Sequence, residues 1–143
     1  MKITGNDIDI HVNGVTLCYD DLGDGAVPIL FIHGFPFDKS SWQPQVKFLK
    51  SKRRVIAYDI RGYGKSTEGN EKVSMDLFAD DLVNFMDALR IEKAVVCGLS
   101  MGGYILLTAI TDTRNGSKPM YYVIHNASVI LRKEKKHVQR RSG

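Results

Sequence analysis

Three short apolar runs, each followed directly by a loop that contains glycine, restrict most strongly how this chain can fold. They occupy residues 28–32, 55–58 and 94–97. A run without regular alternation of polar residues is typical of a parallel strand that is buried on both faces. The carboxyl ends of parallel strands meet at one edge of a sheet, where open α/β sheets bind ligands. We therefore expect the three loops to lie together at that edge.

A hairpin signal precedes the first of these runs. Residues 7–12 and 15–20 flank Asn13-Gly14, the strongest short signal for a β-hairpin. Strands then alternate with helical patterns along the chain. This order predicts an α/β fold, with a mostly parallel sheet and an amino-terminal antiparallel hairpin.

Two helices are expected between the strands. Ser41 is expected to cap the first, which runs to about residue 50 with an inner stripe of Trp42, Val46 and Leu49. Ser74 is expected to cap the clearest helix, whose apolar residues repeat at helical spacing as far as residue 89. The polar side of that helix is expected to face water, and it consists of Asp76, Asp80, Asp81, Asn84 and Asp87.

The positive charge of the chain is concentrated near its carboxyl end. Residues 1–110 carry 12 Lys and Arg against 14 Asp and Glu, whereas residues 111–143 carry 8 against 2. The net charge of +4 is therefore not the signature of a nucleic-acid-binding domain, and no nucleic acid partner is expected. No apolar run is as long as a membrane span, so no membrane partner is expected. The amino terminus lacks an apolar signal region, which favours a cytoplasmic location, and the oligomeric state stays open.

The pentapeptide Gly98-Leu99-Ser100-Met101-Gly102 lies between the apolar run 94–97 and the apolar residues 104–107. A sharp turn from strand to helix holds its central serine exposed in a strained conformation. Glycine two residues before and two residues after the serine removes side chains that would collide in such a turn. The pattern predicts that Ser100 is a nucleophile; the plainer alternative is an ordinary serine in a turn.

Two further motifs come before this one. His33-Gly34-Phe35-Pro36 follows the run 28–32, and the segment 59–66, Asp-Ile-Arg-Gly-Tyr-Gly-Lys-Ser, follows the run 55–58. Together and in this order, the three motifs resemble the amino-terminal half of an α/β-hydrolase of the esterase, lactonase and perhydrolase kind, over about residues 8–110. The resemblance implies a three-layer fold and an acyl-enzyme mechanism on a small carboxylic ester or lactone, with no metal and no organic cofactor.

The resemblance also assigns roles to residues around Ser100. The backbone N–H groups of Phe35 and Met101 would form the oxyanion hole, since Pro36 has no N–H. His33 would shape the loop that carries Phe35, and a merely hydrogen-bonded loop histidine is the alternative. The supporting residues are then Gly34, Gly98, Gly102, Asp59 and Arg61, of which the last two would hold their loop by hydrogen bonds. Candidate walls of an apolar acyl pocket, or plain core contacts, are Phe37, Trp42 and Tyr63.

The resemblance stops after about residue 110. In this family the acid and the histidine of the triad follow the serine on later strands. The only histidines after Ser100 are His125 and His137. Asp112 lies about three turns along the helix that follows Ser100. We therefore expect a fold that is incomplete at its carboxyl end, without triad acid or base, and with little or no turnover.

Residues 111–143 read as an atypical basic tail, with one possible added strand near 120–131. A truncation, or a slip of the reading frame near residues 110–120, is the hypothesis for this change, and translation of the encoding DNA in the other frames would test it. Two other functions stay open. One is a non-catalytic binding module on a hydrolase scaffold, and the other is a basic tail that binds anionic partners.

Overall fold

The computed structural model describes residues 3–112, 121–125 and 129–132. The hypothesis of a frame slip near residues 110–120 falls mostly on residues outside these ranges. The strands are β1 (Gly5–Val12), β2 (Val15–Leu22), β3 (Ile29–Ile32), β4 (Val55–Tyr58), β5 (Val95–Leu99), β6 (Tyr121–His125) and β7 (Val129–Arg132). The helices are the 3-10 helix η1 (Lys39–Trp42), α1 (Gln43–Leu49), α2 (Met75–Ala88) and α3 (Met101–Thr111).

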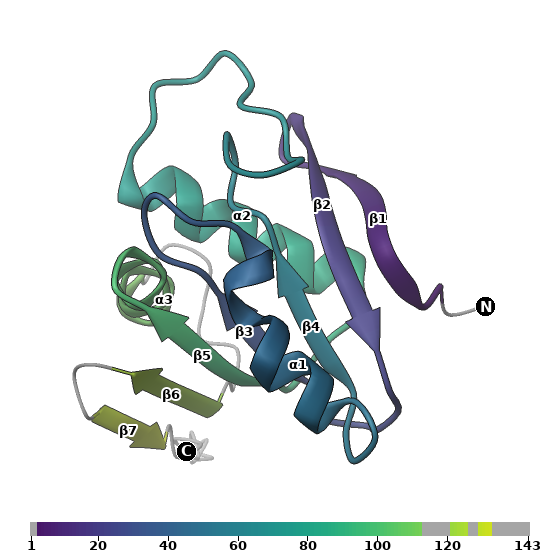
Figure 1. Ribbon diagram of the computed structural model, residues 1–143. Helices are drawn as coiled ribbons and strands as arrows, with labels where there is room; N and C mark the ends of the chain where they lie inside the picture. Colours follow the sequence, from purple (N-terminus) through teal and green to yellow (C-terminus); the bar gives the residue numbers. More distant parts are fainter. Residues whose placement is uncertain (1–2, 113–120, 126–128, 133–143) are drawn as a thin grey trace, which may run out of the picture.

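In the described part of the chain, seven strands form one mixed sheet in the order β1-β2-β4-β3-β5-β6-β7 (Figure 1). The central pairs β3–β4, β3–β5 and β5–β6 are parallel. The pairs β1–β2, β2–β4 and β6–β7 are antiparallel. The predicted α/β class and the amino-terminal hairpin are confirmed. The carboxyl ends of β3, β4 and β5 reach the same edge, so the three sequence motifs lie along it.

Helices cover both faces of the sheet and complete three layers (Figure 1). The larger core holds α2 and α3 against one face, through side chains such as Phe78, Phe85 and Ile105. On the other face, η1 and α1 pack through Trp42 and Val46. Within the described ranges, no helix is long and apolar enough to cross a bilayer.

The predicted cap of α2 is confirmed, whereas that of the first helix is wrong. Ser74 Oγ accepts a hydrogen bond from the N–H of Leu77 at 3.0 Å. At the first helix, Asp38 is the capping residue, because its carboxylate accepts from the N–H of Ser40 at 2.8 Å. Ser41 lies inside the 3-10 turn and donates its hydroxyl to the backbone oxygen of Asp38. Residues 39–42 therefore form a separate turn before α1 begins.

One acidic residue of α2 does not face water. Asp81 is 2 % exposed and pairs with the equally buried Arg61. The expectation that Asp81 lies on the solvated side of the helix is therefore wrong. The helical repeat puts Asp81 next to the apolar residues of α2. Arg61, from the loop after β4, supplies the positive charge that makes the burial of Asp81 favourable.

Candidate active site

Ser100 stands in the turn that joins β5 to α3. Its backbone has φ 52° and ψ −113°, in the left-handed half of conformational space. A non-glycine residue in a sparsely populated region costs about 1–3 kcal/mol, and such strain occurs mainly at functional sites. The side chain is exposed at the carboxyl edge of the sheet. The turn therefore presents the hydroxyl to an incoming molecule.

The glycines around this turn allow backbone segments to touch. A Cβ added to Gly98 would lie 2.5 Å from the carbonyl carbon of Gly102. A Cβ added to Gly102 would collide with the backbone oxygens of Ile32 and His33 at the end of β3. Real Cβ atoms do not come so close, so α3 can begin at this place only because both residues are glycines.

The loop after β3 comes equally close to the serine. A Cβ added to Gly34 would lie 2.9 Å from the backbone oxygen of Leu99 and 3.3 Å from Cβ of Ser100. Phe35 directly follows Gly34, and Met101 is the first residue of α3. The first N–H groups of a helix have no acceptor within the helix, and they favour negative charge. The structure thus brings the segments of both predicted oxyanion-hole donors beside Ser100.

Both ring nitrogens of His33 are engaged in the interior. The side chain is fully buried, its Nδ1 donates to the backbone oxygen of Gly34 at 3.0 Å, and its Nε2 accepts from the N–H of Ile60 at 2.9 Å. These partners require the neutral ring with its proton on Nδ1. Burial lowers the pKa of His33 below its ordinary value of 6.5. His33 therefore joins the loops after β3 and β4 and has no nitrogen left to accept a proton from Ser100.

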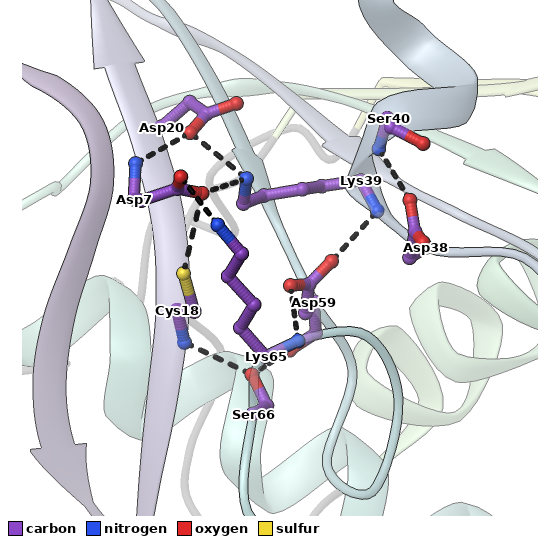
Figure 2. A network of polar contacts seen from close by, with 9 residues as sticks. All are labelled: Asp7, Cys18, Asp20, Asp38, Lys39, Ser40, Asp59, Lys65 and Ser66. Atoms are coloured by element: carbon purple, nitrogen blue, oxygen red, sulfur yellow. Dashed lines mark hydrogen bonds and ion pairs between the residues drawn. The ribbon is translucent and has the colours of Figure 1, made fainter.

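Asp59 fixes the loop after β4. Its two carboxylate oxygens accept from the backbone N–H groups of Lys39 at 2.8 Å and Lys65 at 2.9 Å (Figure 2). A Cβ on Gly64 would collide with this carboxylate. The backbone oxygen of Asp59 also accepts the hydroxyl of Ser66 at 2.7 Å. One carboxylate thus ties the far end of the Phe35 loop to the loop after β4.

A group of ion pairs lies beyond Asp59 (Figure 2). Asp7 contacts Lys39 Nζ at 2.7 Å and Lys65 Nζ at 2.6 Å, and Lys39 Nζ also contacts Asp20 at 3.1 Å. Hydrogen bonds from the two lysines lower the pKa of Asp7 to about 2. A cavity of about 500 Å³ opens beside this group and does not include Ser100 in its lining. Sequence reasoning missed the group, because its members come from four segments and no spacing connects them.

The guanidinium of Arg61 is held by hydrogen bonds within the fold. It donates Nε–H to Asp81 at 2.8 Å and Nη2–H to Asp81 at 2.9 Å and to the backbone oxygen of Asn13 at 2.9 Å. Hydrogen bonds to the Asp81 carboxylate raise the pKa of Arg61. The side chain joins the loop after β4 to α2 and to the hairpin turn.

The aromatic candidates separate into two groups. Tyr63 makes edge-to-face contacts with His33 at 5.6 Å and with Phe35 at 6.2 Å between ring centroids. Phe35 and Phe37 are 66 % and 56 % exposed at the carboxyl edge. Trp42, by contrast, is buried and stacks on Phe31 at 4.4 Å in the core under α1. Trp42 is thus a core residue, in agreement with its expected place in the inner stripe of the first helix.

No described side chain hydrogen-bonds to the hydroxyl of Ser100. Besides His33, the histidine with a described side chain is His11, whose Nδ1 lies 3.5 Å from Thr16 Oγ1 in the hairpin. The backbone of His125 pairs with Leu99 at the end of β6. His137 lies outside the described residues. Within the described ranges, no group of three or more His, Cys, Asp or Glu residues is placed to hold a metal ion.

Comparison with known proteins agrees with this architecture. The 3-oxoadipate enol-lactonase 1 of Acinetobacter baylyi is 39% identical over 106 residues, which cover 74% of this chain and 35% of that protein. The bifunctional esterase/perhydrolase DCH of Acinetobacter calcoaceticus is 39% identical over 93 residues, 64% of this chain and 34% of that protein. The chain thus spans about a third of the length of the curated relatives it matches.

Solved structures of two enzymes have a similar fold. A thermophilic esterase from Thermogutta terrifontis superposes with a TM-score of 0.71 at 32% identity, over 82% of this chain and 44% of that one. Est816, an N-acyl homoserine lactone degrading enzyme, superposes with a TM-score of 0.72 at 32% identity, with the same coverage. A family model described as the alpha/beta hydrolase fold matches residues 27–115. The chain belongs to the α/β-hydrolase fold family.

Proposed function

We propose that this chain carries the acylation half of a serine hydrolase site for carboxylic esters or lactones, with Ser100 as the nucleophile. The observation that carries the proposal is the strained turn at Ser100, closed by the contacts of Gly98 and Gly102. A turn of this kind exposes a hydroxyl at the edge of the sheet where α/β proteins bind ligands. Relatives described as an esterase and an enol-lactonase support this substrate class.

In the proposed reaction, Ser100 Oγ attacks the acyl carbon of the ester or lactone. The carbonyl oxygen becomes negative, and the N–H groups of Phe35 and Met101 donate hydrogen bonds to it. Each such donor lowers the barrier by about 3 to 4 kcal/mol. The bond to the alcohol oxygen then breaks, the serine proton goes to that oxygen, and the acyl group stays on Ser100 until water hydrolyses it.

Transfer of the serine proton needs a base, and no described residue provides one. The ring nitrogens of His33 are both hydrogen-bonded, and no other described side chain contacts the hydroxyl. A triad enzyme without its base retains a residual acceleration of about 10³–10⁴ over water. We therefore propose that this chain alone acylates slowly at Ser100 and turns over poorly.

A fluorophosphonate probe tests the proposal, because it phosphonylates an activated or well-placed serine. The chain is incubated for a long period across a range of pH, and the modified residue is identified by mass spectrometry. We expect slow modification of Ser100 in preference to other exposed serines, with a rate that rises in proportion to hydroxide. Ser100→Ala abolishes the label, whereas Ser51→Ala, at another exposed serine, leaves it unchanged.

Two other outcomes would each overturn part of the proposal. A rate that reaches a plateau near neutral pH would show that a titrating base acts on Ser100. Modification of Ser100 no faster than of Ser51 would show that the turn gives no catalytic advantage. In the second case, binding of an ester without acylation would support the alternative function, a binding module on a hydrolase scaffold.

A further inference from the structure

The carboxyl-terminal half of α1 and the turn after it form a basic surface around one exposed aromatic ring. Phe48 is 65 % exposed, and Lys47, Lys50, Lys52 and Arg53 around it are also exposed. We call these five residues the α1 basic surface. A single exposed apolar side chain is normal for a protein, but one with four exposed cations within the same seven residues of chain is a distinct chemical pattern.

The cations of this surface form no ion pair among the described residues, although Lys47 and Lys50 also line the cavity beside Asp7 and Asp20. Lys52 Nζ lies 4.0 Å from the centroid of the Phe48 ring. Next to the surface, Arg54 binds Asp21 through Nε and Nη2, so that nearby carboxylate already has its cation. Among the residues that the structure describes, no ion pair joins Lys47, Lys50 or Arg53 to an acidic side chain. The surface therefore presents net positive charge to solvent.

The helix on the opposite face of the sheet is acidic and contains no lysine or arginine. α2 lies across the sheet from α1 and carries Asp76, Asp80 and Asp87 (Figure 1). A domain with a cationic side and an acidic side takes a preferred orientation in the field of a charged surface. An anionic surface therefore attracts the α1 side.

The position of the surface also separates it from Ser100. α1 follows β3 and leads back to the start of β4, so its end lies at the amino edge of these parallel strands (Figure 1). Ser100 lies at the carboxyl edge, after β5. A flat partner bound at the α1 basic surface thus leaves the opposite edge open to small molecules.

We propose that the α1 basic surface binds the face of an anionic membrane, with the Phe48 ring in the headgroup region. An exposed apolar ring with long cationic side chains on the same short segment matches this interface, because lysine stems extend along apolar surface while the charged ends reach lipid phosphates. Nucleic acid fits less well: successive bases need several stacking rings, whereas this surface has one. A peripheral contact of this kind needs no spanning helix, and it departs from the expectation that no membrane partner exists.

Binding of the full chain to lipid vesicles tests the proposal. The vesicles contain either phosphatidylcholine alone or a mixture of phosphatidylcholine and phosphatidylglycerol. We expect binding to the mixed vesicles only, and weaker binding as salt is added. Each cation near an anionic surface changes partitioning about fivefold, so Lys47→Gln/Lys50→Gln/Lys52→Gln should lower it on the order of a hundredfold.

The matched control is Lys72→Gln/Arg90→Gln/Lys93→Gln, which removes the same charge from exposed positions outside the surface. The basic residues after 131 are unchanged in both variants, so their contribution cancels. The control should partition as the parent chain does. An equal loss in both variants would show that only net charge matters, and it would overturn the proposal.

A reporter at the ring gives a second, independent readout. Phe48→Trp places an exposed indole on the surface, whereas the natural Trp42 is buried and stacked on Phe31. We expect a blue shift of the emission when mixed vesicles are added, and none with phosphatidylcholine alone. An emission that stays unshifted while the chain binds would overturn the insertion of Phe48. If Lys47→Gln/Lys50→Gln/Lys52→Gln lost affinity for a single-stranded oligonucleotide and kept its vesicle binding, the membrane assignment would be wrong.

Discussion

His33 accepts the backbone N–H of Ile60 on its Nε2 at 2.9 Å and thereby joins the carboxyl ends of β3 and β4. The same ring donates from Nδ1 to the backbone oxygen of Gly34, and no part of it reaches solvent. A proton on Nε2 would face the N–H of Ile60 with no acceptor between them. The folded chain therefore holds this ring neutral, and the loop that carries Phe35 depends on that state.

Stability should consequently fall in mild acid. Burial lowers the pKa of His33 in the folded chain, whereas the unfolded chain titrates near 6.5. Below that pH the unfolded state binds more protons, so the contribution of the neutral ring is complete above about 6.5 and is lost as the pH falls through the lowered folded pKa. Urea unfolding at several pH values, compared between the parent chain and His33→Gln, measures the effect.

His11→Gln is the control for that experiment, because His11 is exposed in the hairpin. The stability of the control should change with pH as that of the parent chain does. The stability of His33→Gln should not show the fall between pH 7 and 5 that the buried ring causes. A parent chain whose stability stays level over this range would contradict the role given to His33.

Gly102→Ala should disrupt the turn at Ser100. The added methyl group would collide with the backbone oxygens of Ile32 and His33, and neither can move without opening β3. Overpacking of this kind costs about 3 kcal/mol or more in free energy of unfolding. Thr108→Ala in the same helix should cost far less, since it removes a hydroxyl that donates to the backbone oxygen of Tyr104 within the helix and adds no atom. Equal midpoints of urea unfolding for the two variants would show that α3 does not press on β3.

Removal of one partner of the Arg61–Asp81 pair should be much worse than removal of both. Asp81→Asn leaves a buried guanidinium without its counter-charge, at a cost of about 3 to 5 kcal/mol. Arg61→Met/Asp81→Leu should regain most of that loss, because apolar groups of similar size need no counter-charge. A double-mutant cycle by urea unfolding measures the coupling, and strictly additive losses would contradict it. The exposed Asp76→Asn should change stability by about 0.5 kcal/mol or less.

Asp59→Asn should loosen the Phe35 loop at its far end. An amide offers one oxygen, whereas the carboxylate accepts from both Lys39 and Lys65. One backbone N–H then loses its acceptor, at a cost of about 1 to 3 kcal/mol. We expect a lower unfolding midpoint and faster hydrogen exchange at Lys39 or Lys65. Asp9→Asn on the exposed side of β1 is the matched control, and an equal change in both variants would remove the special role of Asp59.

Local signals in the sequence were sufficient for most of the elements. Asn13-Gly14 marked the hairpin because only a tight turn with left-handed residues joins two strands so closely, and Asn13 has φ 49°. The serine before α2 marked its start because its oxygen can accept a free N–H of the first turn. These features depend on neighbours within a few residues, so the sequence contains them directly.

The errors arose where a partner comes from far along the chain. Asp81 has the residue type of a surface position, and its burial depends on Arg61, 20 residues earlier. For Trp42 the sequence left two interpretations open, a core residue of the first helix and a wall of a pocket, and the short turn after Asp38 directs it into the core against Phe31. For the site, spacing identified the segments that meet at Ser100. The neutral state of His33 required the contacts of its ring with Gly34 and Ile60.

β3 is enclosed by β4 and β5, so its amides are protected from solvent exchange along both sides. Edge strands such as β1 open first in a native protein, and central strands open close to the limit set by global unfolding. Under mild denaturant, local opening should therefore proceed from the rim of the sheet toward its middle. The loop of Phe35 is attached to the last strand to open. Its contact with the turn at Ser100 should therefore persist after most of the domain has opened.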